Sequence, residues 1–589
     1  MFIDPHGLEH EGPGSDKIAL ASEIKKLEQR LIDPTVTLES AILSPGNNRM
    51  KVEHLWTMRG QARPGRTWRP CMCTSWPSRA TWTRCLGWQR PDTCDLQSNK
   101  TLEDPMQDLG FDTRHILING QWRASASGQH LLLSNPSDGS ALAQIARGQA
   151  EDIDAAVSAA QAALDGPWGA LSAAERGRLL LRMSAITLEQ ADELARLEAL
   201  DVGKPLKQGR ADALALARYL EFYGGAADKV MGDTIPFANG YTAFSIREPH
   251  GVTGHIVPWN YPMQIIGRSV GAALAMGNAC VLKPAEEACL TALAFGRIAQ
   301  QAGLPAGAVN IVTGLGEEAG AALSAHPGVA HLSFTGSVAV GRLIQAAAAK
   351  NTIPVTLELG GKSPQIVFAD ADLDAALPFL VNAGIQNAGQ TCSAASRILV
   401  ERPVFDEVQR RMAERYAALR VGPALQDADI GPLISPRQQA IVQGYLALAR
   451  DSGLRIAGQA RLPADLPAGG CYVAPTLLGP ASADHRLAQE EIFGPVQVMI
   501  PFEGEAEALA IANGTAFGLV AGVWTRDGGR ALRMARKLRC GQVFINNYGA
   551  GGGIELPFGG VKHSGHGREK GFEALYGFSA LKTIAIKHD

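Results

Sequence analysis

The sequence lacks the features of a secreted or membrane-bound chain. Its nine cysteines are odd in number and irregularly spaced, unlike the paired pattern of a disulfide framework. No apolar run approaches the ~20 residues that a membrane-spanning helix needs. The first residues, MFIDPHGLEHEG, contain no apolar segment of a secretion signal. These absences predict a protein of a reducing, cytoplasmic compartment.

A strong charge of one sign is also missing. The 55 Lys and Arg against 58 Asp and Glu leave a formal net charge of −3, and no basic stretch alternates with aromatic residues. Proteins that bind nucleic acid or anionic membranes usually carry such a basic surface, so we expect neither as a partner. The chain is long, and its 589 residues predict two or three domains. Its hydrophobic content of 46% is typical of a globular protein.

Residues 1–109 differ in composition from the rest. They hold five of the nine tryptophans and four cysteines, Cys71, Cys73, Cys85 and Cys94, with neither helical nor strand periodicity. Three interpretations stay open: a mis-assigned start, a disordered extension, or a zinc module. The zinc module lacks the usual two-residue spacer and a histidine partner. We favour the first and assign this segment no function.

Strand-like and helical patterns alternate after residue 251. Such alternation predicts a parallel sheet with helices on both faces, whose ligands bind at the carboxyl ends of the strands. Ahead of it, helical patterns cover 152–164, 173–199 and 211–223, and Asn239-Gly240 predicts a hairpin. The predicted strands are 254–257, 279–283, 309–313, 331–334 and 355–359, and the predicted helices between them are 263–276, 290–301, 317–325 and 338–349.

The loops after the first two predicted strands carry polar residues in constrained settings. In Pro258-Trp259-Asn260-Tyr261-Pro262, two prolines hold the backbone around Asn260, a neutral amide donor. Lys283 and Glu286 follow the second strand. An acidic residue here can bind ribose hydroxyls and repel a 2′-phosphate, and Glu287 adds to that repulsion.

The next loops are rich in glycine. Gly314-Leu315-Gly316 resembles a dinucleotide fingerprint, but its spacing is off by one and two acidic residues follow, so the signal is weak. The fourth loop, Phe334-Thr335-Gly336-Ser337, enters a predicted helix and suits a pyrophosphate or another phosphate group.

Glu358 ends the fifth predicted strand, and Cys392 follows on a Gly-Gln-Thr-Cys loop. A cysteine attacks as its thiolate, and a carboxylate can accept a proton directly or through a water. Seen alone, the pair is equally compatible with a core cysteine and a salt-bridged glutamate. Their position beside the other loops favours catalysis.

Seven motifs, in order, make residues 110–589 resemble the NAD(P)-dependent aldehyde dehydrogenase superfamily. Their number and order make the resemblance specific. They are PWNYP (258–262), KPAE (283–286), FTGS (334–337), LELGGKSP (357–364), GQTCSA (389–394), EEIFGP (490–495) and PFGGVKHSGHGRE (557–569).

The resemblance implies oxidation of an aldehyde with NAD, through a thiohemiacetal and a thioester on Cys392. It implies Glu358 as general base, an oxyanion hole formed by Asn260 and the Cys392 backbone N–H, and no metal. Twelve residues are implied to hold NAD: Pro258, Trp259, Lys283, Glu286, Gly316, Phe334, Thr335, Gly336, Ser337, Leu359, Glu491 and Phe493.

The implied fold is α/β and aldehyde dehydrogenase-like. A Rossmann-type parallel-sheet cofactor domain would comprise 110–228 and 249–360, and an α/β catalytic domain 361–560. A small β oligomerisation arm would comprise 229–248 and 561–589, where LKTIAIK (581–587) alternates like an edge strand. Such an arm implies a homodimer or homotetramer.

Departures from the family pattern bear on the substrate. Arg268-Ser269 stands where many relatives carry Trp-Lys, so a lysine relay to Glu569 is not implied. Arg268 faces an anionic substrate or pairs with Glu569 or another carboxylate. Glycines in 547–553 replace an aromatic wall of some relatives, which favours a semialdehyde or aromatic aldehyde over a short aliphatic one.

Two other functions fit the sequence less well. A CoA-acylating semialdehyde dehydrogenase is disfavoured because Glu358 is retained as a hydrolytic base. A non-catalytic binding or structural protein on the same scaffold is disfavoured because Cys392, Glu358 and Asn260 are all present.

Overall fold

The structure, a computed structural model, describes residues 36–44, 51–58, 109–549 and 553–588. It divides into two compact units, residues 1–99 and 100–589. In the first unit, β1 (Val36–Ser44) and β2 (Lys51–Met58) pair antiparallel. Cys71, Cys73, Cys85 and Cys94 lie outside the described residues, so the interpretations of that segment stay predictions.

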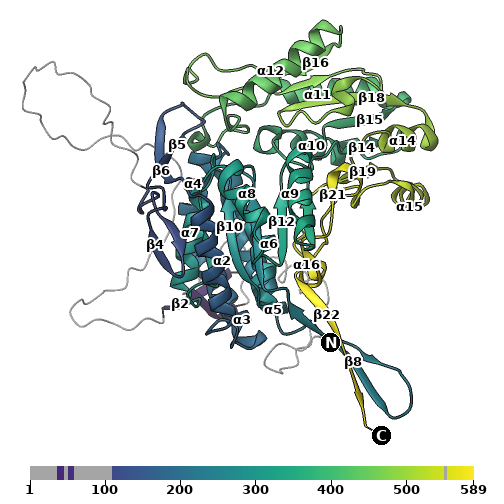
Figure 1. Cartoon of the computed structure of the whole chain (residues 1–589). Helices are drawn as coiled ribbons and strands as arrows, with labels where there is room; N and C mark the ends of the chain where they lie inside the picture. The colour runs from purple at the N-terminus through teal and green to yellow at the C-terminus, as the bar shows by residue number, and fades with distance from the viewer. Residues whose placement is uncertain (1–35, 45–50, 59–108, 550–552, 589) are drawn as a thin grey trace, which may run out of the picture. The chain divides into compact units, whose positions relative to one another are not determined.

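An eight-stranded sheet organises the first part of the second unit (Figure 1). Its spatial order is β21-β13-β12-β9-β10-β11-β3-β4, and the five central strands run parallel. These five are the predicted strands, with ends shifted by no more than two residues. The strands are β3 (Ile116–Ile118), β4 (Gln121–Arg123), β9 (Val252–Val257), β10 (Ala279–Pro284), β11 (Val309–Ile311), β12 (His331–Thr335), β13 (Val355–Glu358) and β21 (Gly565–His566).

The strand order changes direction between β9 and β12. After β9 the chain adds β10 and β11 on one side, and then β12 and β13 on the other. The loops that leave β9 and β12 therefore diverge and open a crevice at the carboxyl edge, where such sheets bind ligands. Asn260 comes from one loop and Gly336-Ser337 from the other.

Some helices pack directly against this sheet, and others form a further layer of helices. Helix α2 contacts β10 and β11, α6 contacts β9 and β10, α7 contacts β11, and α9 contacts β12 and β13, while α3, α4 and α5 pack together and α5 also contacts α6. The helices are α2 (Ala150–Leu164), α3 (Ala173–Glu189), α4 (Ala191–Asp201), α5 (Leu206–Ala226), α6 (Pro262–Ala275), α7 (Leu290–Gln301), α8 (Ala321–Ala325) and α9 (Val338–Lys350).

Two predicted helices differ in detail from the structure. The pattern over 173–199 breaks at Gln190, which ends α3 and begins α4. The predicted helix 317–325 is a π-helical turn, Gly316–Gly320, followed by the short α8. Both differences arise because periodicity marks an apolar face but does not locate a local break in the backbone.

A seven-stranded sheet forms the second core of this unit, in the order β16-β17-β18-β15-β14-β19-β20. All of its neighbouring strands are parallel except the pair β16 and β17. Its elements are β14 (Pro364–Val367), α10 (Leu373–Ile385), β15 (Arg397–Glu401), α11 (Phe405–Ala417), α12 (Pro436–Asp451), β16 (Ile456–Gln459), β17 (Thr476–Leu478), α13 (Arg486–Gln489), β18 (Val496–Phe502), α14 (Gly504–Asn513), β19 (Val520–Trp524), α15 (Gly528–Lys537) and β20 (Gln542–Ile545).

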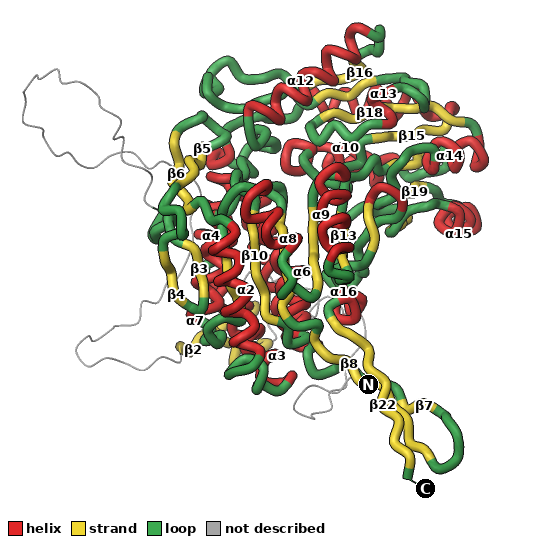
Figure 2. The backbone as a smooth tube through the Cα atoms, viewed as in Figure 1, coloured by secondary structure: helices red, strands yellow, loops and turns green. Residues whose placement is uncertain are grey.

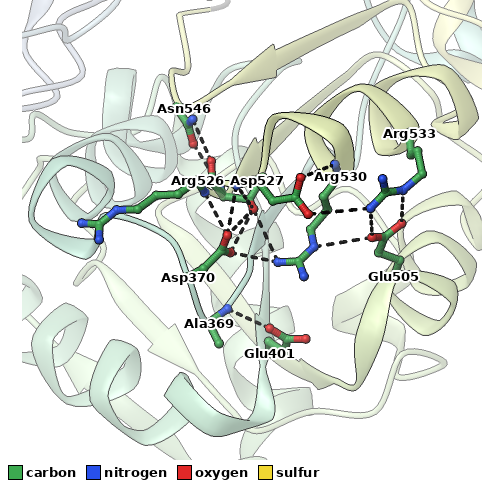
Figure 3. Close-up of polar contacts among 10 residues, drawn as sticks. Ala369, Asp370, Glu401, Glu505, Arg526, Asp527, Arg530, Arg533 and Asn546 are labelled. Carbon is green, nitrogen blue, oxygen red and sulfur yellow. Dashed lines mark hydrogen bonds and ion pairs between the residues drawn. The ribbon is translucent and has the colours of Figure 1, made fainter.

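Asp370 joins two carboxyl ends of this second sheet (Figure 3). Directly after β14, its carboxylate accepts hydrogen bonds from the Thr525 hydroxyl, the backbone N–H groups of Arg526 and Asp527, and the Arg530 guanidinium. Because these donors follow β19 and begin α15, one carboxylate fixes three elements together. Since β14 leads directly from the Gly360-Gly361 turn, the network steadies the frame on which the site is built.

A small antiparallel sheet, β22-β8-β7, extends away from the helices of the first sheet (Figure 2). Strands β7 (Thr234–Ile235) and β8 (Tyr241–Pro249) form the predicted hairpin, and β22 (Ser579–Lys587) pairs along β8. Ahead of β22, strand β21 pairs with β13 and α16 (Gly571–Gly577) packs on α6. A separate hairpin joins β5 (His130–Ser134) to β6 (Ala141–Ala146).

In the described part of the chain, no helix is long and apolar enough to cross a bilayer.

Candidate active site

Two cavities meet at Cys392. The helix-side cavity, of about 260 Å³, is lined by residues of α5, α6 and α10 together with the Cys392 loop. The strand-side cavity, of about 320 Å³, is lined by the loops after β9, β12 and β13 and by the start of α12. Asn260 and Cys392 line both cavities. A molecule in either cavity can therefore reach the same sulfur.

The loop that carries Cys392 is held from several sides. It follows a tight turn, Gln386–Gly389, in which Asn387, Ala388 and Gly389 all have positive φ. The Gln390 side chain donates to Asn387 O at 3.0 Å and accepts from Ile434 N–H at 2.9 Å. A Cβ on Gly361 would lie 2.3 Å from Cys392 O, so only glycine allows the neighbouring chain this close. The thiol is thus placed by packing rather than by its own short loop.

Burial raises the pKa of the Cys392 thiol to about 11, while the positive charge of Arg268 opposes that shift and Glu358 adds to it. The thiol is therefore protonated at neutral pH, and a nearby base or positive charge is needed to form the thiolate.

Asn260 is buried, and its amide lies beside the thiol loop. Its Nδ2 donates to Gln390 O at 3.0 Å, and its backbone O accepts from Asn387 Nδ2 at 2.9 Å. The side-chain amide carries two N–H groups, so it can hold the loop with one and still donate into the cavities with the other.

Glu358 ends β13 and lines the strand-side cavity. Its side chain is buried, and neither carboxylate oxygen has a hydrogen-bond partner among the described residues. Burial raises the pKa of this carboxyl well above its usual value, although Arg268, Arg568 and Lys570 oppose the shift. A Cβ on Gly559 would lie 2.7 Å from Glu358 Oε1, so a glycine is needed there. Such a carboxyl gains a proton readily, as a general base requires.

Arg268 pairs with a carboxylate, one of the two arrangements expected for it. Its Nε forms an ion pair with Glu569, and its NH2 contacts Thr335 Oγ1 at 3.3 Å. Ser333 Oγ donates to the other oxygen of Glu569 at 2.8 Å. Arg268 also lines the helix-side cavity, so its charge faces that cavity with Glu569 behind it.

Seven of the twelve residues implied to hold a cofactor line the strand-side cavity: Pro258, Trp259, Thr335, Gly336, Ser337, Glu491 and Phe493. The other five do not line it. Lys283 pairs with Glu286 at 2.8 Å at the end of β10, Gly316 begins the π-helical turn, and Phe334 and Leu359 are buried in the core. Of the neighbouring acids Glu286 and Glu287, only Glu287 lines the cavity.

Glu491 and Phe493 are placed by unusual backbone geometry. Gly361 N–H donates to Glu491 Oε1 at 2.9 Å, and a Cβ on Gly360 would lie 2.0 Å from Glu491 Oε2. Burial raises the pKa of Glu491 to about 7. The Phe493 and Trp259 rings meet edge-to-face, with their centroids 5.4 Å apart. Phe493 has a positive φ of 56°. The two glycines therefore let this carboxylate approach the turn directly after Glu358.

Sequence reasoning missed two groups of lining residues. Ile434, Ser435, Arg437, Gln438 and Ile441, from the start of α12, line the strand-side cavity. Gln264, Phe379, Tyr548, Phe558 and Lys570 line the helix-side cavity. Ser435-Pro436 is a recognisable helix start. Nothing in the local sequence, however, indicates that this helix start lines the strand-side cavity. Lys570 directly follows the last motif, Phe558 lies inside it and Tyr548 lies in the 547–553 loop, so these three had a signal in the sequence.

Known proteins match this chain over most of its length. A sequence model of the aldehyde dehydrogenase family matches residues 122–584. Hydroxyisobutyraldehyde dehydrogenase of Mycolicibacterium austroafricanum is 41% identical over 472 residues, covering 80% of this chain and 93% of that protein.

Solved structures agree with the sequence match. A Burkholderia cenocepacia protein named as an aldehyde dehydrogenase is 63% identical, with a TM-score of 0.80 over 81% of this chain and 100% of its own. The NAD⁺ complex of a Bacillus cereus aldehyde dehydrogenase is 37% identical, with a TM-score of 0.79 over 82% and 98%. The predicted α/β fold and resemblance are confirmed, and the chain belongs to the aldehyde dehydrogenase family as an NAD-dependent aldehyde dehydrogenase.

Proposed function

We propose that this enzyme oxidises its aldehyde with Cys392 as nucleophile, Glu358 as general base and Asn260 as oxyanion donor. The observation that carries this assignment is that Cys392 and Asn260 line both cavities. A nucleophile between two chambers can bind an aldehyde from one side while a dinucleotide occupies the other. Glu358 reaches the same region from the strand side.

The strand-side cavity fits NAD. Ser337 caps the N-terminus of α9 there, a place where backbone N–H groups favour a phosphate. Glu491 offers a buried carboxylate for ribose hydroxyls, and the Trp259–Phe493 pair offers an aromatic wall. Lys283 with Glu286 would hold the other ribose. NAD bound here supplies the acceptor for the hydride that leaves the substrate carbon.

The chain's own residues account for the other steps. Glu358, directly or through a water, accepts the thiol proton of Cys392, and the thiolate attacks the aldehyde carbon to form a thiohemiacetal. The Asn260 amide and the Cys392 backbone N–H donate to the oxyanion. Loss of hydride leaves a thioester on Cys392. Once that first proton has passed to solvent, Glu358 takes a proton from water, whose oxygen attacks the thioester. The acid is released, and the departing Cys392 thiolate takes the proton back from Glu358.

The wider organisation follows the same proposal. Residues 110–228 and 249–360 form the NAD-binding domain, 361–560 the catalytic domain, and 229–248 with 561–589 the arm of a homodimer or homotetramer. Support for the arm comes from β22, an edge strand with exposed Leu581 and Ile586. We place the enzyme in a cytoplasmic compartment, acting on a small aldehyde and not on nucleic acid.

Replacing Asn260 with alanine should lower kcat by ~10²–10³, the usual effect of losing one oxyanion donor. The measurement is NADH formation with a panel of aldehydes. Asn351→Ala is a matched control, because that amide also donates to backbone carbonyls but lies after α9, outside both cavities. A variant at Asn260 with wild-type kcat would remove this residue from the oxyanion hole.

NAD should be used with a kcat/KM about tenfold or more above that for NADP, because a 2′-phosphate would meet Glu286 and Glu287. The double variant Glu286→Gln, Glu287→Gln should lower the ratio of kcat/KM for NAD to kcat/KM for NADP. The measurement is kcat/KM for both cofactors. Glu414→Gln is the control and should leave the ratio unchanged, because Glu414 is exposed on α11, pairs with Arg410 and lines neither cavity. A wild-type preference for NADP would contradict this role for the two acids.

A further inference from the structure

Cys392 and Ser393 are the central residues of a tight turn. Ala394 N–H donates to Thr391 O at 2.9 Å, which closes a β-turn around the nucleophile. A peptide group is planar and trans, so its C=O and N–H point in opposite directions. The N–H that shares a plane with Thr391 O is that of Cys392, and it therefore points out of the turn. None of the described residues accepts a hydrogen bond from it.

The Tyr548 hydroxyl fixes the other side of this turn. From the loop after β20, it donates to Ser393 O. Ser393 O and Ala394 N–H belong to one peptide plane, so this bond sets the direction in which Ala394 N–H points at Thr391 O. A chain of hydrogen bonds thus runs from Tyr548 through two peptide groups to the Cys392 N–H. Each bond polarises the next, which strengthens the donor at the end of the chain.

The Tyr548 hydroxyl is not needed for packing. The side chain is buried, and its ring meets the Phe544 ring edge-to-face with centroids 5.8 Å apart, a contact that a phenylalanine would also make. A buried hydroxyl is costly unless it is hydrogen-bonded. Burial raises the pKa of Tyr548, although Ser363 and Gln365 oppose the shift, so the hydroxyl keeps its proton at neutral pH and stays a donor. Its contribution is therefore the bond to the turn.

We propose that Tyr548 is a positioning residue for the oxyanion hole: its hydroxyl holds the turn so that the Cys392 N–H points at the oxygen of the bound aldehyde. This proposal rests on the proposed function, because it concerns the second donor of the same oxyanion hole. The first donor, Asn260, is held by its own bond to Gln390 O at 3.0 Å. The two donors are thus oriented by separate contacts, and each can be disturbed without the other.

Tyr548→Phe should lower kcat about 10-fold, less than the ~10²–10³ of a donor that is lost, because a misdirected N–H still donates weakly. KM should change less than about twofold, because the hydroxyl acts on the transition state through the turn. Tyr548 also lines the helix-side cavity, and a hydroxyl that touched the substrate would raise KM instead. The measurement is NADH formation with the aldehyde panel at saturating NAD.

Alkylation of the thiol separates the direction of the N–H from disorder of the turn. Iodoacetamide reacts with Cys392 by displacement of iodide, so no oxyanion forms. Its rate should therefore differ less than about threefold between Tyr548→Phe and wild type, since the nucleophile itself is unchanged. Mass spectrometry of the peptide that contains Cys392 measures this rate. A turn that was merely loosened would change alkylation together with kcat.

Tyr472→Phe is the matched control. Tyr472 is buried, its hydroxyl donates to Ser137 O at 2.8 Å, and it lines neither cavity. Both variants lose one buried bond from a hydroxyl to a backbone carbonyl, so their Tm values should fall by similar small amounts. Only Tyr548→Phe should lose kcat.

Three outcomes would overturn the proposal: wild-type kcat in Tyr548→Phe, a rise in KM in place of the fall in kcat, or an alkylation rate that falls as much as kcat. In each case, activity that still depends on Cys392 and Asn260 would leave the proposed function standing. Retained activity in Cys392→Ala would count against the function itself.

Discussion

Cys392→Ala should abolish aldehyde oxidation, with kcat lowered ~10⁴-fold or more, because covalent catalysis has no second nucleophile to use. Among the described residues, Cys280, Cys289, Cys471 and Cys540 line neither cavity that meets at Cys392. The measurement is NADH absorbance with the aldehyde panel. The variant should still bind NAD, which is measured by quenching of the protein fluorescence. Retained binding would show that the variant is folded.

Cys540→Ala is the matched control. Burial raises the pKa of that partly buried thiol to about 11, as it does for Cys392, yet Cys540 lies outside both cavities. It should therefore retain wild-type activity. A Cys392→Ala enzyme that oxidised aldehydes at a near-normal rate would contradict the assignment of the nucleophile.

Glu358→Gln should lower steady-state kcat by ~10²–10⁴, the usual range for loss of a general base. Hydrolysis of the thioester is the step most affected, because water is a weak nucleophile without a base. We expect a burst of NADH close to one equivalent per enzyme, formed more slowly than in wild type because Glu358 also accepts the thiol proton, and then a still slower steady turnover. Stopped-flow absorbance measures both phases. Wild-type kcat in this variant would exclude Glu358 as the base.

The pH dependence of this step follows from burial. Because the pKa of Glu358 is raised well above its usual value, its basic carboxylate form appears only as pH rises. Wild-type kcat should therefore increase with pH over a range shifted upward from that of an ordinary carboxyl, and the Gln variant should lose that increase. Glu401→Gln is the control, since Glu401 ends β15, accepts from Ala369 N–H and lies outside both cavities.

Coenzyme A separates hydrolysis from acyl transfer in the same experiment. Hydrolysis assisted by Glu358 predicts free acid as the product and no acceleration when coenzyme A is added to wild type. Formation of an acyl-CoA with faster turnover would instead favour the CoA-acylating alternative.

Much of the fold was accessible from local pattern. The five parallel strands are short segments in which apolar and β-branched residues predominate, and each ends at or shortly before a Gly, Pro or charged residue, so their limits were predicted to within two residues. The hairpin at Asn239-Gly240 and the edge strand near the C-terminus were equally local signals. Where periodicity extended across a break, as at Gln190, the pattern predicted one helix and the backbone formed two.

The sequence by itself also predicted the residues that we propose to react. Asn260, Glu358 and Cys392 lie at strand ends or on constrained loops, where residue type and position point to chemistry. The strand order was not local, yet it decides which loops form the crevice, because the switch between β9 and β12 exists only once the sheet is assembled.

Only the tertiary structure decided which residues face Cys392. Arg268 turned out to pair with Glu569 because β21 and α16 bring the end of the chain beside α6 and β13. The start of α12 reaches the strand-side cavity, and Lys570 reaches the helix-side cavity from a backbone position with positive φ. Side-chain direction and burial depend on contacts between distant segments, and those contacts leave no periodic mark in the sequence.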